Sequence, residues 1–290
     1  NLVIIMDDYW TDFKNKIIGQ KDLASIGFAN IVGTGISAIF WLYLASVIEP
    51  TEYGEIHYFI AIAALAQIIS LIGSSNVLTV YTAKKIKIQA TLFSISLLVA
   101  VVSAIVIIVI FFRFDVGLLV LGYIIFELMN AVLLGRKAYT EYSKYFLTQK
   151  TLMVVFGIGF YYLIGFDGIL YGFVLSFVPY IALIFREFKE TKIDFSLLKS
   201  RKGFIANNYA MGLSGRMGST IDKLIVAPLL GFVLLGNYSL ALQLFVVLYM
   251  IPIIIYKYLL PQDASGKPNN KLKQTAVLMS VGITVLGVVF

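Results

Sequence analysis

Several residue types that enzymes depend on are missing or rare in this sequence. Its 290 residues include no cysteine and one histidine. The lack of cysteine excludes disulfide frameworks and thiol nucleophiles, and a single histidine argues against zinc sites built on Cys or His and against Ser-His triads. No P-loop, GxSxG or HExxH motif is present. We therefore predict a protein that is not an enzyme and that has no catalytic residue, metal site or cofactor.

Charged residues are also scarce. They make up 13% of the chain, whereas 60% of the residues are hydrophobic and the mean hydropathy is +0.90. Soluble globular chains contain about 25% charged residues and do not reach this hydropathy. The composition therefore predicts an integral membrane protein.

Long apolar runs are abundant. A helix needs about 20 mostly apolar residues to cross a bilayer, and nine stretches approach or exceed that length. They lie at 22–48, 56–80, 90–113, 116–135, 146–165, 168–185, 204–230, 236–260 and 272–290. We predict an all-α integral membrane protein with about nine transmembrane helices.

The basic residues are concentrated on one side of these predicted helices. Most of the 23 Lys and Arg residues fall in the N-terminal tail and in alternate loops, among which we include Lys150 and Lys257. The opposite side has Arg113 and several acids. The positive-inside rule therefore predicts a multi-pass protein of the cytoplasmic membrane with a cytoplasmic N-terminus. The same bias explains the net charge of +7 without nucleic acid, while contact of the basic loops with anionic membrane lipids stays open.

An internal repeat organises the chain. Placing Gly54 on Gly236 aligns the end of the first predicted helix and the start of the second with the end of the seventh and the start of the eighth. Six helices separate the copies, so both enter the membrane from the same side, as parallel repeats do. The predicted parts are a cytoplasmic tail, a six-helix lobe, a cytoplasmic linker and a partial second lobe, at 1–21, 22–185, 186–203 and 204–290.

The predicted helix at 204–230 carries Arg216, Asp222 and Lys223. Each such charge costs roughly 2.5 to 3.5 kcal/mol at the centre of a membrane helix. Arg216 and Lys223 are seven positions apart and share one face, whereas Asp222 points about 120° away from Arg216. The two cations match a phosphate ligand. The alternatives are that they neutralise carboxylates such as Glu127, or that Lys223 extends outward to the membrane surface. Small residues near Asp222, including Gly215, predict close approach of another helix.

Other polar residues within predicted spans are candidates as well. Glu127 and Asp222 are candidate ion-coupling carboxylates, for which a structural salt bridge is the alternative. The repeat places Thr34 at the position of Arg216, and Asn30 lies one turn before it. We include Asn30 and Thr34 with Arg216 and Lys223 as candidate substrate-binding residues, although hydrogen bonds between helices would use the same side chains.

The chain resembles the polysaccharide-transporter branch of the MATE-like flippase superfamily, also called the MOP exporters. The resemblance rests on the Pro50-Thr-Glu-Tyr-Gly54 pattern and on its second-half counterparts, Asp222-Lys-Leu-Ile-Val-Ala-Pro-Leu-Leu-Gly231 and Leu235-Gly-Asn-Tyr-Ser-Leu-Ala241. It implies two six-helix lobes around a cavity that opens alternately to either side. Because this chain supplies six helices and then three, the second lobe looks truncated.

The resemblance also implies a substrate, a polyprenyl-linked oligosaccharide moved from the inner to the outer leaflet, with H⁺ or Na⁺ as a possible coupling cation. A cation-coupled exporter of small amphipathic drugs is the nearest alternative. A non-transporting membrane scaffold and a membrane-embedded glycosyltransferase are more distant ones, favoured if the three charges of 204–230 are fully paired with no cavity between the lobes.

Overall fold

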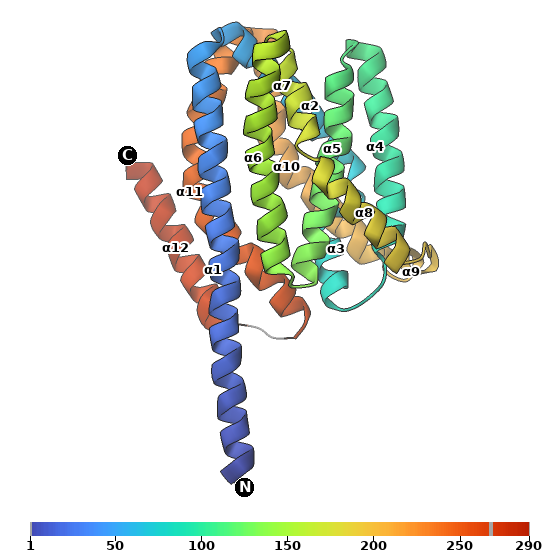
Figure 1. The fold of residues 1–290 in the computed structure, drawn as a ribbon, viewed down its shortest axis with the longest axis vertical. Coiled ribbons are helices and arrows are strands. Elements are labelled where there is room, and N and C mark those ends of the chain that lie inside the picture. Colours follow the sequence, from blue (N-terminus) through green and yellow to red (C-terminus); the bar gives the residue numbers. More distant parts are fainter. Residues whose placement is uncertain (1, 267–268, 290) are drawn as a thin grey trace.

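The computed structural model describes residues 2–266 and 269–289, and every regular element within them is a helix. The elements are α1 (Leu2–Val47), α2 (Pro50–Ser70), α3 (Ser74–Ala83), α4 (Gln89–Phe111), α5 (Phe114–Gly135), α6 (Tyr139–Ile164), α7 (Gly168–Leu175), α8 (Val178–Glu190), α9 (Ser196–Lys199), α10 (Lys202–Leu230), α11 (Phe232–Ala264) and α12 (Asn270–Val289). The long helices run up and down beside one another, and the N-terminal part of α1 extends beyond the rest (Figure 1).

Six segments within the described residues are long and apolar enough to cross a membrane, and together they account for α1, α2, α4, α5, α6 and the α7–α8 pair. The 23 residues of α4 illustrate the reason. At about 1.5 Å per residue they exceed the ~30 Å hydrocarbon core. Large apolar side chains along α4, such as Leu98, Ile105 and Val109, are exposed, as lipid-facing side chains are. The predicted all-α membrane architecture is therefore confirmed.

Two stretches that we predicted as single membrane helices are broken. The stretch at 56–80 divides into α2 and α3 because Gly73 adopts φ +90°, a left-handed conformation that suits glycine and ends the helical path. The stretch at 168–185 divides into α7 and α8 at Ser176 and Phe177, just before Pro179 in the first turn of α8. Proline is accommodated in a first turn because the N–H groups there have no partner within the helix, so the missing N–H of proline breaks no hydrogen bond.

The N-terminal bundle, α1–α8, is built around α5. About two thirds of the most apolar part of α5 is buried. The C-terminal helices, α10–α12, lie along one side of it, with α10 against α2 and α3 and α11 against α1 and α2. Gly54 and Gly236, the glycines that the repeat equates, lie where α2 crosses α11. A Cβ on Gly54 would overlap the Phe232 carbonyl oxygen, and one on Gly236 would overlap that of Pro50. The two copies of the repeat therefore meet backbone to backbone.

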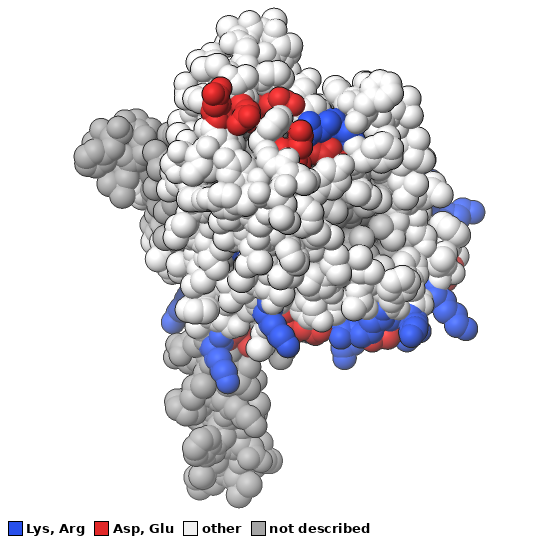
Figure 2. Space-filling view, turned by 45° about the horizontal axis from the view of Figure 1, so that its top comes forward, with Lys and Arg blue, Asp and Glu red and all other residues white. Residues whose placement is uncertain are grey.

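Charge separates along the long axis of the helices. Figure 2 shows acidic side chains with one basic patch near one end, and at the other end many basic side chains with some acidic ones between them. The surface between the two ends is largely uncharged. At the acidic end, Arg113 forms ion pairs with Asp115 at 2.7 Å, Asp167 at 3.0 Å and Glu55 at 3.5 Å. The two ends of the helices therefore differ in charge, and the cytoplasmic placement of the basic end stays a prediction of the positive-inside rule.

Candidate functional site

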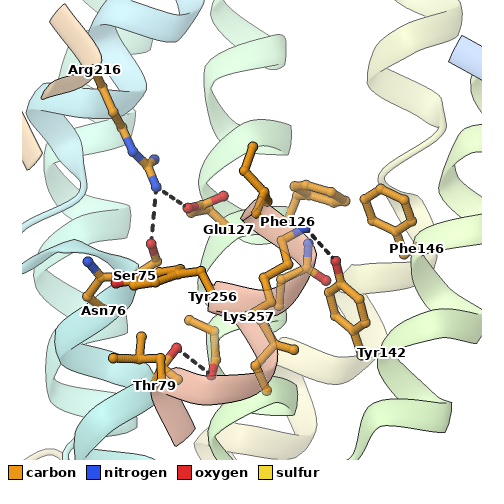
Figure 3. Close-up of a pocket in the computed structure, with 15 residues that line it drawn as sticks. Ser75, Asn76, Thr79, Phe126, Glu127, Tyr142, Phe146, Arg216, Tyr256 and Lys257 are labelled. Atoms are coloured by element: carbon orange, nitrogen blue, oxygen red, sulfur yellow. Dashed lines mark hydrogen bonds and ion pairs between the residues drawn. The ribbon is translucent and has the colours of Figure 1, made fainter. Parts of the chain in front are cut away.

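A cavity of about 220 Å³ lies between the N-terminal bundle and the C-terminal helices. Its walls come from α3, α5 and α6 on one side and from α10 and α11 on the other. Its polar lining is formed by Ser75, Asn76, Thr79, Glu127, Asn130, Tyr142, Arg216, Tyr256 and Lys257 (Figure 3). We call it the central cavity.

Arg216 from α10 reaches across the central cavity to α5. Its Nη2 donates to Glu127 Oε1 at 2.6 Å and to Ser75 Oγ of α3 at 3.1 Å. The Arg216 and Glu127 side chains are 42% and 21% exposed, so the pair borders the cavity and is not sealed in the protein core. One ion pair thus links the C-terminal helices to the N-terminal bundle, as the salt-bridge alternative for Glu127 predicted.

Lys257 is the second cation of the central cavity. It lies within α11, and its ammonium donates to Asn30 Oδ1 of α1 at 2.7 Å and to the Tyr142 hydroxyl of α6 at 2.8 Å. It also lies 5.3 Å from the centre of the Phe146 ring, within cation–π range. These partners are neutral oxygens and an aromatic ring, and none of them is a carboxylate that would offset the charge of the ammonium.

Lys150 is a third cation, in a neighbouring cavity of about 260 Å³. We call this one the lateral cavity; it shares Phe126, Glu127 and Arg216 with the central cavity. Lys150 lies on α6, roughly 16 Å along the helix axis from Tyr139 at 1.5 Å per residue, or about half the thickness of a hydrocarbon core. Its ammonium lies 5.5 Å from the centre of the Phe146 ring. No carboxylate of the described residues forms an ion pair with it.

The two cavities have an excess of positive charge. Among the described residues that line them, Arg216, Lys150 and Lys257 are cationic, and Glu127 is the one carboxylate. Since Arg216 is paired with Glu127, the charges of both lysines lack a carboxylate counterion there. A charge within an apolar slab is costly unless it is compensated, so this arrangement favours an anionic ligand.

A wider cavity of about 530 Å³ adjoins the central one, with which it shares Asn76, Tyr256 and Leu260. Its other walls include Lys84, which follows the end of α3, and Asp263 near the end of α11. It therefore lies beside the central cavity, on the side toward the basic end of the molecule.

The other predicted residues lie elsewhere. Asp222 accepts a hydrogen bond from the Tyr238 hydroxyl of α11, and Lys223 Nζ lies 3.4 Å from Asp222 Oδ1. This cluster joins α10 to α11, and neither charged residue lines the cavities described above. The structure thus does not bring Lys223 together with Arg216 in one cavity, and its substrate-binding role stays a prediction.

The first-half candidates divide. Asn30 is buried and binds Lys257, so it supports the central cavity through that lysine. Thr34 is half-buried on α1 and does not line either cavity. The small-residue prediction fails at Gly215, where an added Cβ would meet nothing within 4 Å.

The assignment of Lys150 and Lys257 to cytoplasmic loops was wrong. Both lie inside helices, because α6 begins at Tyr139 and α11 continues to Ala264. The sequence did contain a signal for Lys257, which falls inside the predicted span 236–260. Lys150 falls within 146–165 in the same way. If each lysine had been assigned to the predicted span that contains it, and not to the nearest loop, both would have been predicted to lie within the membrane.

Comparison with known proteins supports the fold. No family model and no curated protein matches this sequence. A MOP superfamily transporter from Pyrococcus furiosus aligns over 91% of this chain and 69% of its own, with a TM-score of 0.57 and 14% identity; it is described as having a binding pocket of reverse polarity that suggests a different function.

Two further structures agree. A MATE protein solved in complex with Br-NRF covers 91% of this chain and 72% of its own, with a TM-score of 0.55 and 15% identity. An outward-facing multidrug-resistance MATE family transporter of the MOP superfamily covers 91% and 69%, with a TM-score of 0.52 and 16% identity. Likeness at such low identity establishes the fold alone. The chain is therefore a multi-pass membrane protein with the fold of the MOP superfamily transporters.

Proposed function

We propose that this protein is a flippase for lipid-linked oligosaccharides, which moves a polyprenyl diphosphate cargo across the cytoplasmic membrane. In this proposal the N-terminus of the protein lies in the cytoplasm. The observation that carries the proposal is the excess of positive charge in the cavities. Lys150 and Lys257 line them, and the one carboxylate among the described lining residues, Glu127, is already paired with Arg216. A diphosphate that crosses an apolar slab needs countercharge at mid-membrane.

The chemistry of the three cations suits phosphate. A guanidinium offers several N–H donors in a planar fork, and lysine ammonium groups act as mobile point charges. Arg216 and Lys257 come from α10 and α11, whereas Lys150 comes from α6. A diphosphate bound by all three would therefore link the two groups of helices, and a relative movement of those groups would carry it from one side toward the other.

The drug-exporter alternative shares the fold but needs a different cavity. A cationic drug would meet an excess of like charge here, which disfavours its binding. The scaffold alternative required full pairing of the charges in 204–230 and no cavity between the two groups of helices. Pairing is present for Arg216 and for Asp222 with Lys223, yet the central cavity lies between those groups, so transport is the better proposal.

The test is translocation in vesicles. The purified protein is reconstituted into phosphatidylcholine vesicles that contain a fluorescent farnesyl diphosphate linked to a sugar, and transbilayer movement is followed by quenching from outside. Arg216→Gln removes the charge at the centre of the site, and we expect it to reduce the rate at least tenfold, which corresponds to about 1.4 kcal/mol.

The matched control is Arg201→Gln. Arg201 precedes α10 and donates to the Leu197 carbonyl oxygen, outside both cavities. We expect this variant to retain the wild-type rate. Equal rates for wild type and Arg216→Gln would contradict the proposed anion site.

A further inference from the structure

The lateral cavity differs from the central one in its lining. Apart from the residues that the two share, it is formed by two amides, three aromatic rings and one ammonium: Gln67, Gln149, Tyr123, Phe173, Phe177 and Lys150. Amides next to aromatic faces suit a ring that carries both hydroxyl groups and apolar C–H faces. The lining therefore fits a sugar better than it fits a second phosphate.

Gln149 lines the lateral cavity and carries a buried acceptor without a partner among the described residues. Its side chain is 1% exposed, and its Nε2 donates to Ser176 Oγ at 2.9 Å. That bond fixes the amide, yet no donor within the described part of the chain reaches Gln149 Oε1. A buried acceptor without a donor costs about 1 to 3 kcal/mol, so a ligand hydroxyl that donates to it would recover this free energy.

The aromatic wall is held in place by its own packing. The Tyr123 ring lies edge-on to Phe173 at 5.9 Å and to Phe177 at 5.7 Å between ring centroids. Gly122 makes room for Phe177, because a Cβ there would press against that ring. Gln67 donates to the Tyr123 carbonyl oxygen at 3.3 Å, which ties α2 to the same wall. The wall is therefore preformed and needs little reorganisation to bind a ring.

We infer that the lateral cavity is a sugar subsite, which binds the sugar attached to the diphosphate while the central cavity holds the phosphates. This inference rests on the proposed function. Gln149 Oε1 accepts a hydrogen bond from a sugar hydroxyl, the aromatic wall packs on the ring, and Lys150 lies beside the phosphate next to that sugar. The shared residues Phe126, Glu127 and Arg216 mark the junction of the two parts.

The experiment compares two soluble probes of equal charge that differ in the group on the terminal phosphate: farnesyl diphosphate esterified with methyl and farnesyl diphosphate linked to N-acetylglucosamine. Binding to the purified protein in detergent is measured by titration calorimetry. We expect the wild type to bind the sugar-linked probe about tenfold more tightly, as one buried hydrogen bond of about 1.4 kcal/mol provides. In Gln149→Met the ratio of the two affinities should fall to about one.

Gln274→Met is the matched control, since Gln274 is exposed on α12; it should keep the wild-type ratio. Equal affinities for the two probes in the wild type would overturn the sugar subsite and leave the anion site intact. If neither probe binds, the proposed function itself fails.

A variant-independent measurement covers the case in which Gln149→Met does not fold. A photoreactive diazirine on the sugar of the same probe is crosslinked to the wild-type protein, and labelled peptides are mapped. We expect labels on α6 and on the α7–α8 break, where Gln149 and Phe177 lie. Labels confined to α3 and α11 would place the sugar in the central cavity and overturn the inference.

Discussion

Arg216 and Glu127 show how an expensive charge is retained within an apolar helix. Each would be unfavourable alone in a hydrocarbon layer, but their 2.6 Å contact brings opposite charges together at the edge of a cavity. Ser75 adds a neutral acceptor for the same guanidinium nitrogen. The pair therefore links α10 to α5 across the cavity, and it also holds Arg216 in position there.

A double-mutant cycle tests whether the two side chains act as a pair. Arg216→Gln and Glu127→Gln each leave one charge beside the cavity without its partner, so each should lower the melting temperature in detergent. The double variant leaves neither charge, and we expect it to recover about 1 kcal/mol relative to the sum of the single effects. Strictly additive effects on unfolding would show that the pair contributes no coupling.

The sequence shows which residues are charged, but it does not show which neighbouring helix each charged side chain faces. Arg216 was identified as a charge within a predicted membrane span, and its pairing with Glu127 was one of two alternatives. Which of the two applied depended on the angle at which α10 faces α5, and helical periodicity within α10 does not fix that angle. The same limitation grouped Lys223 with Arg216, although Asp222 and Tyr238 hold it in a separate cluster.

The crossing of α2 and α11 lies at the two glycines that the sequence repeat aligns, Gly54 and Gly236. Gly54 and Gly236 let the two backbones approach to a distance that no side chain would permit. Both residues lie within the first turns of their helices, at the acidic end of the molecule. The contact therefore closes the space between the two groups of helices at that end.

Gly54→Ala should open this crossing. The added methyl group overlaps the Phe232 carbonyl oxygen, so the helices must separate or strain, at about 1 to 3 kcal/mol. Because the chain has no cysteine, spin labels placed with Thr51→Cys and Leu234→Cys report the distance between the two helix starts. We expect Gly54→Ala to lengthen that distance. Gly35→Ala, at a position with open space, should not, and an unchanged distance in Gly54→Ala would refute a tight closure.

Most helices could be predicted from hydropathy, because each apolar run has to match the bilayer thickness. The breaks could not. Gly73 and Pro179 are signals for a break, yet glycine and proline also occur inside continuous membrane helices, as Pro228 does in α10. Tertiary packing also differs between the two sites: Gly73 precedes the first residue of α3, and Ile205 of α10 lies 3.1 Å from the position of its missing Cβ.

The molecule as a whole combines an apolar exterior with a charged interior. Exposed apolar side chains cover helices such as α4, while Arg216, Lys150 and Lys257 converge from three helices on two joined cavities. A second cavity adjoins the central cavity toward the basic end, and the α2–α11 crossing brings the two groups of helices into contact at the acidic end. For the flippase that we propose, this asymmetry would correspond to a state open toward the basic end.

The claim that the cavity selects an anionic cargo is tested most directly by its charge preference. We would titrate the purified protein with farnesyl diphosphate and with the lipophilic cation tetraphenylphosphonium, for wild type, Lys150→Met and Lys257→Met. Lys144→Met is the control, because Lys144 is exposed on the same helix as Lys150. We expect the wild type and Lys144→Met to bind farnesyl diphosphate and not the cation, and each cavity variant to lose about tenfold in affinity. Binding of tetraphenylphosphonium in preference to farnesyl diphosphate, or a diphosphate affinity that neither cavity lysine affects, would contradict a site that selects an anionic cargo.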